Sequence, residues 1–305
     1  MLERSGIISG MNKLPTAKRC QVLTALIEGC SVNSTARMTG VSVPAILKLA
    51  VDAGEVCAEA HDYLVRGVKS RRVQADEIWS FVGKKEKNAD ENDKACGLGD
   101  AWVWTGIDAD SKLIVSYLVG QRTADCAETF ITDLAARLAN RVQLSTDGLK
   151  VYVDAVEGAF GADVDFGQLV KSYTATVEGQ KRYSPAQCCG AAKTPISGNP
   201  DPKHISTSYS ERLNLTIRMQ DRRFTRLTNA FSKKLENHVA SVHLHNFYYN
   251  FCRVHKSLRV TPAMQAKIAD RVWTMEDVVA LLEAKEAAAA QPKPSGLVPV
   301  RRRAV

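Results

Sequence analysis

The chain has 305 residues, with 41 Lys and Arg against 33 Asp and Glu, which gives a formal net charge of +8 with histidine neutral. Hydrophobic residues make up 45% and charged residues 24% of the chain, which excludes a collagen, a mucin and a wholly disordered protein. No run approaches the roughly 20 apolar residues of a membrane span, and the N-terminus lacks the apolar block of a secretory signal. We therefore expect a cytoplasmic protein with no membrane partner, and the modest basic excess favours a polyanionic one.

A three-helix pattern occupies the N-terminal part of the chain. Apolar residues recur at helical spacing over residues 16–28, Ser31 can cap a second helix, and Ser42 can cap a third. Gly40 lies between the last two helices, where glycine tolerates the left-handed backbone of a tight turn. The order predicts a helix-turn-helix domain that binds DNA, with an arbitrary three-helix cap as the alternative. Lys48 is the main polar donor of the third helix, which favours phosphate contact over sharp base readout.

The hydrophobic pattern changes its period after Arg71. Three stretches of strand composition come first, followed by an amphipathic helix, a strand, a helix, a strand and a late helix. This order predicts an α/β fold with a mixed sheet flanked by helices, opened by an antiparallel three-stranded meander. The expected elements, in chain order, are residues 71–85, 101–108, 112–120, 123–140, 142–148, 149–156, 164–173 and 209–224.

The same patterns predict where the parts of the chain begin and end. After the late helix comes a helical segment, and the final residues carry alanine, proline and three arginines without core-forming periodicity. The predicted parts are a helix-turn-helix domain over 1–56, a connecting helix or linker over 57–70, an α/β domain over 71–268, a C-terminal helix over 269–286 and a disordered basic tail over 287–305.

The sequence contains eight cysteines, none in the CxxC spacing of a zinc ribbon or finger. We expect reduced thiols and no structural zinc, with the vicinal pair Cys188-Cys189 in a loop. Three tryptophans of the α/β region, Trp79, Trp102 and Trp104, are expected to pack on the sheet. A platform for base stacking is the less favoured interpretation.

Three acids occupy positions where the expected fold can bring them together. Asp76 lies within the first strand, Asp147 ends the fourth strand, and Glu211 opens the late helix. If the first and fourth strands are neighbours, the three carboxylates face one another and raise one another's pKa. Divalent cations relieve such repulsion, and two of them can activate an attacking hydroxyl and stabilise the leaving oxygen of a phosphodiester. The three acids therefore predict a catalytic centre that holds two Mg²⁺ ions, with Mn²⁺ as a substitute.

Each acid taken alone has a simpler interpretation. Asp76, followed by Glu77, fits a solvated edge position about equally well. Asp147-Gly148 is a common turn dipeptide, and Glu211 can favour a helix N-terminus through the helix dipole. It is the combination of the three positions that indicates chemistry.

These acids lie in stretches that resemble bacterial insertion-sequence transposases with a DDE catalytic domain, and most closely the insertion-sequence-one (IS-one) family. The resembling stretches are ADEIWSFVGKK, STDGLKVY, TSYSERLNLTIRMQDRRFTR and HNFYYNFCRVHKSLRVTPAM. The resemblance implies that residues 71–268 form an RNase H-like DDE domain with Asp76, Asp147 and Glu211 as its catalytic, metal-binding triad. It also implies that Arg218 contacts terminal DNA and that the protein is bacterial and associated with the nucleoid. The cysteine zinc motif that members of this family typically carry at the N-terminus is absent from the sequence.

Basic residues support a nucleic-acid partner independently of the resemblance. Guanidinium groups bind phosphate oxygens in pairs of hydrogen bonds, and each neutralised phosphate adds a salt-dependent contribution to affinity. A solvated basic helix face is the alternative for the group that follows Glu211, and a structural role is the alternative for His255. Arg253 and Lys256 are expected on one side of a later helix. The predicted DNA-binding residues are Lys48, Arg212, Arg218, Arg222, Arg223, Arg253, His255 and Lys256.

Together these features predict a Mg²⁺-dependent DNA transposase. It would cut a DNA strand at the end of its element and transfer the freed 3′-hydroxyl into target DNA. Synapsis of two double-stranded ends favours a homo-oligomer on DNA. The alternatives are an RNase H-like nuclease that cuts without joining and a DNA-binding regulator that keeps an inactive catalytic domain.

Overall fold

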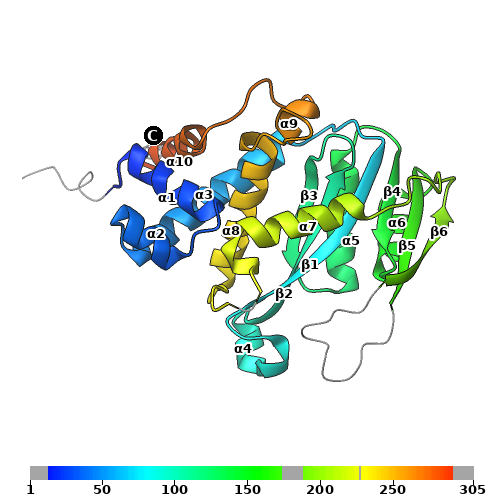
Figure 1. The fold of residues 1–305 in the computed structure, drawn as a ribbon, viewed down its shortest axis with the longest axis horizontal. Coiled ribbons are helices and arrows are strands. Elements are labelled where there is room, and N and C mark those ends of the chain that lie inside the picture. The colour runs from blue at the N-terminus through cyan, green and yellow to red at the C-terminus, as the bar shows by residue number, and fades with distance from the viewer. Residues whose placement is uncertain (1–12, 174–187, 227, 291–305) are drawn as a thin grey trace, which may run out of the picture.

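A six-stranded mixed sheet forms the centre of the computed structural model, which describes residues 13–173, 188–226 and 228–290. The strands lie in the order β3-β2-β1-β4-β5-β6 (Figure 1). They are β1 Arg72–Val82, β2 Gly99–Asp108, β3 Ile114–Gly120, β4 Val142–Asp147, β5 Val164–Tyr173 and β6 Cys188–Ser197.

The pairing of the strands follows from the connections between them. β1, β2 and β3 are consecutive in the chain and pair as an antiparallel meander. β4 pairs parallel to β1, and β5 pairs parallel to β4, since the helices α5 (Ala124–Arg137) and α6 (Val151–Phe160) carry the chain back between them. β6 closes the far edge antiparallel to β5. The predicted α/β class, the meander and the contact between the first and fourth strands are confirmed.

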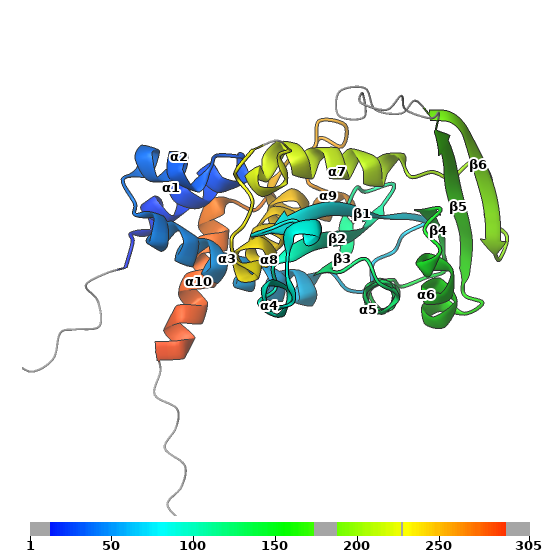
Figure 2. The same ribbon diagram turned by 90° about the horizontal axis from the view of Figure 1, so that it is seen from below.

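Helices cover both faces of this sheet (Figure 2). On one face, α7 (Ser208–Gln220) and α8 (Leu235–Phe247) contribute to an apolar cluster that includes Ile78 and Leu213. On the other face, Trp104 of β2 packs between Phe130 of α5 and Tyr152 of α6, with ring centroids 6.1 and 5.6 Å away. Successive side chains of a strand point to opposite faces, so strand residues alternate between the apolar cluster under α7 and α8 and the one under α5 and α6.

The N-terminal helices are α1 (Thr16–Ile27), α2 (Val32–Thr39) and α3 (Val43–Leu64). The Ser31 hydroxyl accepts a hydrogen bond from the Ser34 backbone N–H at 3.0 Å, and Gly40 ends α2 with φ +70°. The expected cap of the second helix and the glycine turn are thus confirmed, whereas the Ser42 side chain makes no capping hydrogen bond at the start of α3. The expected third helix and the connecting helix after it are one continuous helix of 22 residues, which crosses the predicted boundary between residues 56 and 57.

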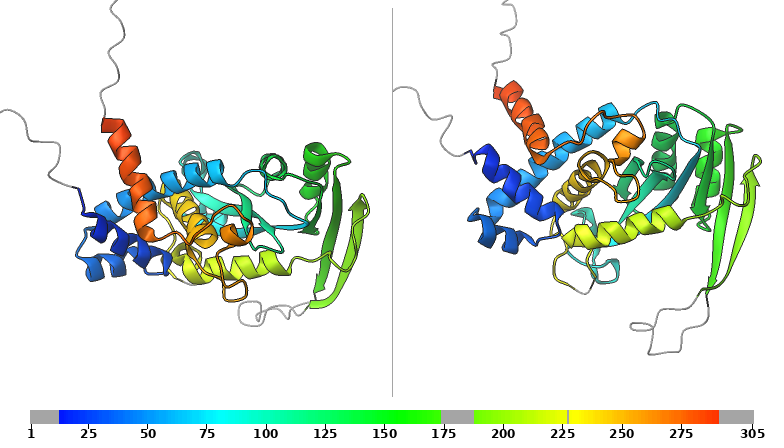
Figure 3. Two further views of the ribbon diagram at one scale, coloured as in Figure 1. Left: turned by 90° about the horizontal axis from the view of Figure 1, so that it is seen from above. Right: turned by 45° about the horizontal axis from the view of Figure 1, so that its top comes forward.

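The C-terminal part returns to the N-terminal helices. After α8 come a π-helical turn (Tyr248–Cys252), a short helix α9 (Pro262–Gln265) and α10 (Met275–Ala290). Figure 3 shows α10 beside α1 in both views, where Arg19 and Glu286 form an ion pair of 3.2 Å. The helix predicted over 269–286 therefore begins and ends later, and the first residues of the predicted tail are helical. Residues 291–305 lie outside the described part of the chain, as do residues 1–12 of the predicted N-terminal domain.

Two further elements differ from the expectations. Cys188 and Cys189 begin strand β6 instead of lying in a loop, because their backbone pairs with β5. The chain between β1 and β2 forms a 3₁₀ turn (Glu86–Asn88) and the short helix α4 (Glu91–Ala95), which the sequence patterns did not predict. Within the described residues, no helix combines the length and the apolar character of a membrane span.

Candidate active site

Strand β1 continues beyond the point where its parallel neighbour β4 ends. The ladder between them joins Arg72, Val73 and Gln74 to residues 143–145, whereas β1 runs on to Val82. Asp147 is the last residue of β4, so its side chain lies beside the part of β1 that has no strand partner on this side. Ligands of α/β sheets commonly bind at the carboxyl ends of strands, where loops leave the sheet open.

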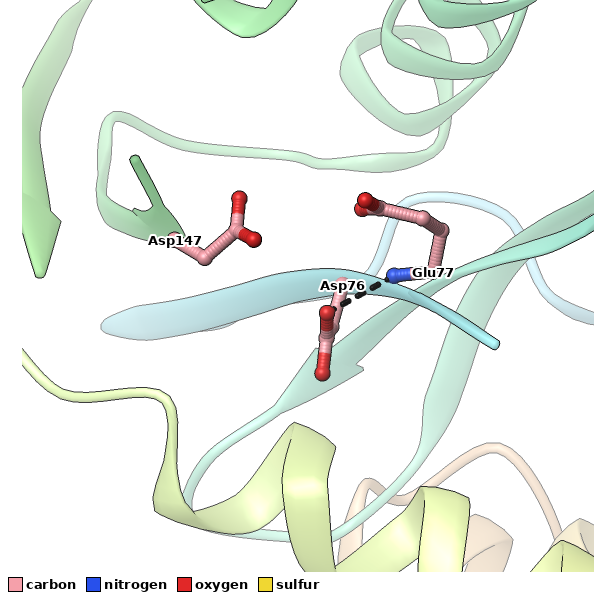
Figure 4. A group of neighbouring side chains, drawn as sticks. All are labelled: Asp76, Glu77 and Asp147. Atoms are coloured by element: carbon pink, nitrogen blue, oxygen red, sulfur yellow. Dashed lines mark hydrogen bonds between the residues drawn. The ribbon is translucent and has the colours of Figure 1, made fainter. Parts of the chain in front are cut away.

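Three carboxylates meet at this opening. Asp76, Glu77 and Asp147 each offer one oxygen, and these oxygens all lie within 4.8 Å of one another. In Figure 4 the Asp76 side chain points toward α7, whereas the Glu77 carboxylate lies on the other side of β1 and faces Asp147. The first and fourth strands therefore bring Asp76 and Asp147 together as predicted, and Glu77 joins them.

Hydrogen bonds fix the orientation of two of these acids. One oxygen of Asp76 accepts from the Glu77 backbone N–H at 2.9 Å, and the other accepts from the Asn214 side-chain amide at 2.8 Å. Asp147 accepts from the Leu149 backbone N–H at 3.0 Å. Asn214 belongs to α7, so this helix is tied directly to the acid at the centre of β1.

Asp76 is the most strongly perturbed acid of the group. Burial raises its pKa to about 7, and the negative charges of Glu77, Asp147 and Glu211 act in the same direction. The hydrogen bond from the Glu77 backbone N–H lowers the pKa but does not offset these effects. The opening therefore concentrates negative charge in a poorly solvated place, which is the electrostatic environment that favours a bound cation.

Glu77 is held by its own set of partners. The Arg122 side chain lies 2.6 Å from one carboxylate oxygen, and the Tyr152 hydroxyl donates to the other at 3.0 Å. Burial raises the pKa of Glu77, and the negative charge of Asp147 adds to this, whereas Arg122 and Tyr152 lower it. Only 2% of the Glu77 side chain is exposed, so Arg122 and Tyr152 supply the contacts that water would otherwise make.

Glu211 lies apart from the other acids. It is in the first turn of α7, where its carboxylate pairs with Lys171 and accepts from the Thr207 hydroxyl at 2.6 Å. Its side chain is 47% exposed, and it does not belong to the group of acids with oxygens within 4.8 Å. The predicted triad is therefore only partly assembled, although the Glu211 charge is near enough to raise the pKa of Asp76.

Sequence reasoning assigned no role to Glu77 because alternation along a strand sends it to the face opposite Asp76. The signal that would have identified it is the end of β4 at Asp147, which leaves the edge of β1 without a paired strand at this level.

The predicted DNA-binding residues of α7 and of the 3₁₀ turn after it (Arg222–Phe224) have different surroundings. Arg212 is exposed and Arg218 is half-buried; burial is the largest cause of the lowered pKa of Arg218, with the Arg226 charge second, and Asp76 opposes both. Arg222 is also partly exposed. Arg212, Arg218 and Arg222 thus remain available to an anionic partner.

Arg223 has a structural environment instead. Its guanidinium donates to the Ser232 hydroxyl at 2.6 Å, and burial is the main cause of its lowered pKa. Its backbone N–H donates to the Asp221 carboxylate at 3.0 Å. These contacts join the end of α7 to the loop before α8, which is a sufficient reason for an arginine at this position.

The second predicted basic group follows the π-helical turn. Arg253, His255 and Lys256 lie beyond its end at Cys252, so the expected helix that would place Arg253 and Lys256 on one side does not extend that far. The His255 ring packs edge-on against Tyr249 at 4.6 Å, and burial lowers its pKa to about 4. The neutral His255 is therefore a packing residue, whereas Lys256 is exposed.

Lys48 lies on the exposed side of α3. Its side chain is 75% exposed, and its ammonium group pairs with Asp52, one helical turn away, at 2.5 Å. A phosphate at this position would compete with an exposed ion pair, which is weak.

No protein-family model matches the chain, and no curated protein matches it. A functional assignment therefore rests on the residues and geometry described above.

Proposed function

We propose that the chain is a DDE-type DNA transposase whose α/β domain is RNase H-like and uses two divalent cations. The observation that carries this proposal is the group formed by Asp76, Glu77 and Asp147 at the place where β4 ends beside β1. The strand order, with an antiparallel meander followed by two parallel strands, is compatible with an RNase H-like core.

The donor set suits a hard divalent cation. All three groups offer carboxylate oxygens, which Mg²⁺ and Mn²⁺ prefer, and their spacing allows one ion to contact more than one of them. Burial is the main cause of the raised pKa of Asp76 and the neighbouring negative charges add to it, so a cation would stabilise the ionised carboxylate. When bound, such ions polarise a phosphodiester and lower the pKa of an attacking water or hydroxyl.

The chain's own residues would prepare and orient the site. Asn214 fixes one oxygen of Asp76, while Arg122 and Tyr152 fix Glu77, so two of the three acids are preorganised. Glu211 would complete the ligand set by turning away from Lys171, a rotation that its exposed side chain permits. A phosphate of the DNA strand would be held by arginines of α7. Arg218 is close enough to Asp76 for the negative charge of Asp76 to raise its pKa.

The N-terminal helices fit the role of a DNA-binding unit. Helices α1 to α3 contain the capped second helix and the glycine turn expected of a helix-turn-helix. In the proposed reaction this unit holds the element end, and a homo-oligomer brings two ends together on double-stranded DNA.

The central experiment compares Asp76→Asn with Asp154→Asn, a matched change at an exposed position on α6. The substrate is a labelled duplex made from the DNA sequence that flanks the gene on each side, with Mg²⁺ or Mn²⁺ present. We expect cleavage by the wild-type protein and by Asp154→Asn, and none by Asp76→Asn, which should still bind the duplex. Cleavage by purified Asp76→Asn protein would refute the assigned site.

A second assay separates the proposal from its alternatives. Pre-cut ends with a free 3′-hydroxyl are offered together with target DNA, and covalent joining is measured. Joining supports a transposase, whereas cleavage without joining supports an RNase H-like nuclease. Binding of the ends without either activity supports a regulator.

A further inference from the structure

Two tryptophans lie opposite each other beside the acidic site. Trp79 of β1 and Trp102 of β2 are paired across the antiparallel ladder, so their side chains are on the same face of the sheet. Trp104, two residues further along β2, is completely buried under α5 and α6, whereas Trp79 and Trp102 remain partly exposed. The cover provided by α5 and α6 therefore ends between these positions.

Further aromatic rings extend this surface. Phe81 lies 5.7 Å from Trp79 between ring centroids, and Phe231, from the loop before α8, lies 4.7 Å from Phe81. We call Trp79, Trp102, Phe81 and Phe231 the aromatic platform. All four residues are partly exposed.

Cations lie above the rings of the aromatic platform. The Lys85 ammonium is 5.6 Å from the centroid of Trp79 and 5.8 Å from that of Phe81. The Arg122 guanidinium is 4.8 Å from the Trp102 centroid. All three distances are typical of cation–π contacts, so the platform already holds positive charge at its surface.

Charge at this surface is not fully neutralised. Lys84 and Lys94 are paired with acids of the 84–95 segment. Within the described ranges, Lys85 has its aromatic contacts and no acidic partner, and Lys87 is exposed and likewise forms no ion pair. The Lys85 ammonium, beside partly exposed aromatic rings, favours a partner that offers both negative charge and flat apolar rings.

The aromatic platform is continuous with the candidate active site. Arg122 contacts both Trp102 and Glu77, and its guanidinium lies 2.6 Å from the Glu77 carboxylate. Trp79 follows Glu77 by two residues on the same face of β1, which is about 7 Å along a strand. A DNA strand with a phosphate at the acids would therefore meet the platform with a neighbouring nucleotide.

We propose that Trp79 and Phe81 stack a base of an unpaired DNA strand next to the cleavage site. The base would take the place of the Lys85 ammonium above these rings, and Lys85 would then contact a phosphate of the same strand. Arg122 and Trp102 would form the fixed side of the platform, because Glu77 holds Arg122 in place. Unpaired bases offer a free ring face, whereas bases inside a duplex are already stacked on each other. The choice of DNA as the partner rests on the proposed function.

The test is a fluorescence titration in EDTA, with oligothymidylate of about 12 nucleotides, a length within the site sizes of single-strand-binding folds. A duplex of the same length is titrated in parallel. We expect the single strand to quench tryptophan emission and to bind more tightly than the duplex. Trp79→Leu should weaken single-strand binding by about 5- to 150-fold, the equivalent of one lost stacking contact.

Two variants keep the test decisive if Trp79→Leu unfolds. Trp79→Phe keeps a flat ring and should retain most of the affinity, and Lys85→Ala, at an exposed position, should weaken binding and reduce its salt dependence. The control is Tyr63→Leu, which removes an aromatic side chain that is 83% exposed on α3, away from the platform. It should bind like the wild type.

Equal binding by the wild type, Trp79→Leu and Lys85→Ala would overturn the stacking proposal and leave Trp79 as a packing residue. Because the titration contains no metal and no element sequence, its result does not depend on catalysis. Single-strand binding that needs Trp79, without cleavage of element ends, would reject the transposase and keep the platform. Cleavage of element ends together with unchanged single-strand binding by the variants would keep the transposase and reject the platform.

Discussion

Glu77 illustrates how strongly the role of one residue depends on where a neighbouring strand ends. Its carboxylate is buried and is held by Arg122 and Tyr152, yet one of its oxygens lies within 4.8 Å of ligand atoms of Asp76 and Asp147. A residue buried in this way can act as a metal ligand or as a support for the ligands.

Glu77→Gln tests this role directly. The amide keeps the size of the side chain but removes its charge and leaves Arg122 without an ion-pair partner. We expect the affinity for Mn²⁺ to fall by about 10- to 100-fold, the usual effect of losing a residue that orients metal ligands. Isothermal titration with Mn²⁺ measures it, with Asp154→Asn as the control. An unchanged affinity would show that Glu77 only supports the fold around Arg122.

Two residues that were predicted to bind DNA make contacts within the protein instead. Arg223 and His255 were expected to meet phosphate, but Arg223 bonds to Ser232 and His255 packs on Tyr249. The sequence shows how many cations a segment has. It does not show which of them point into the protein.

At the scale of elements, the packing of α3 on α8 depends on a glycine. A Cβ at Gly54 would lie 2.6 Å from the Cα and the carbonyl oxygen of Ala240, which is closer than atoms can approach. The two helices pack closely because Gly54 has no side chain, and this contact attaches the N-terminal helices to α8.

Gly54→Ala should therefore force the two helices apart. We expect a loss of about 1–3 kcal/mol in the free energy of unfolding, as for an overpacked core. Gly158→Ala is the matched control, since nothing lies within 4 Å of a Cβ at that position in helix α6. It should stabilise the protein by about 0.5–1 kcal/mol through helix propensity. Urea denaturation measures both, and equal stability of Gly54→Ala and the wild type would contradict the packing argument.

At the scale of the whole molecule, the histidines make stability depend on pH. Burial lowers the pKa of five of the six histidines to about 4, and these are His61, His238, His243, His245 and His255. The unfolded chain binds protons near pH 6.5, whereas the folded chain binds them only near pH 4. The contribution of these histidines to the free energy of unfolding is therefore complete above pH 6.5 and is lost as the pH falls toward 4. Asp76 has the opposite effect, because its pKa is raised from 3.8 to about 7. Its contribution to stability is complete below pH 3.8 and is lost as the pH rises toward 7.

His61 offers a single-site check of this behaviour. It is 2% exposed and its ring contacts the Ile114 carbonyl oxygen at 3.1 Å. His61→Gln should reduce the slope of unfolding free energy against pH by up to about 1.4 kcal/mol per pH unit between pH 6.5 and 4. His204→Gln, at a ring that is 45% exposed, is the control. Denaturation at a series of pH values measures the slopes, and identical slopes for His61→Gln and the wild type would refute the assignment.

The hydrophobic pattern was sufficient to predict the α/β class, the opening meander and the contact between the first and fourth strands. Local periodicity carries this information because each element must bury one face. Ser31 and Gly40 were predictable for the same reason, since capping and turn geometry are local. The continuity of α3 could not be predicted, because nothing in the sequence distinguishes one long helix from two consecutive ones.

The sequence by itself determined that Asp76 lies in a strand and Asp147 at a strand end, and these two positions predicted the acidic opening. Only the tertiary structure decided that Glu77 belongs to it, that Glu211 is turned toward Lys171, and that Trp79 and Trp102 remain partly exposed beside it. The physical reason is that sequence patterns record which face of an element is buried. Where a neighbouring strand or helix ends is set by long-range packing, and that is where side chains become available for chemistry.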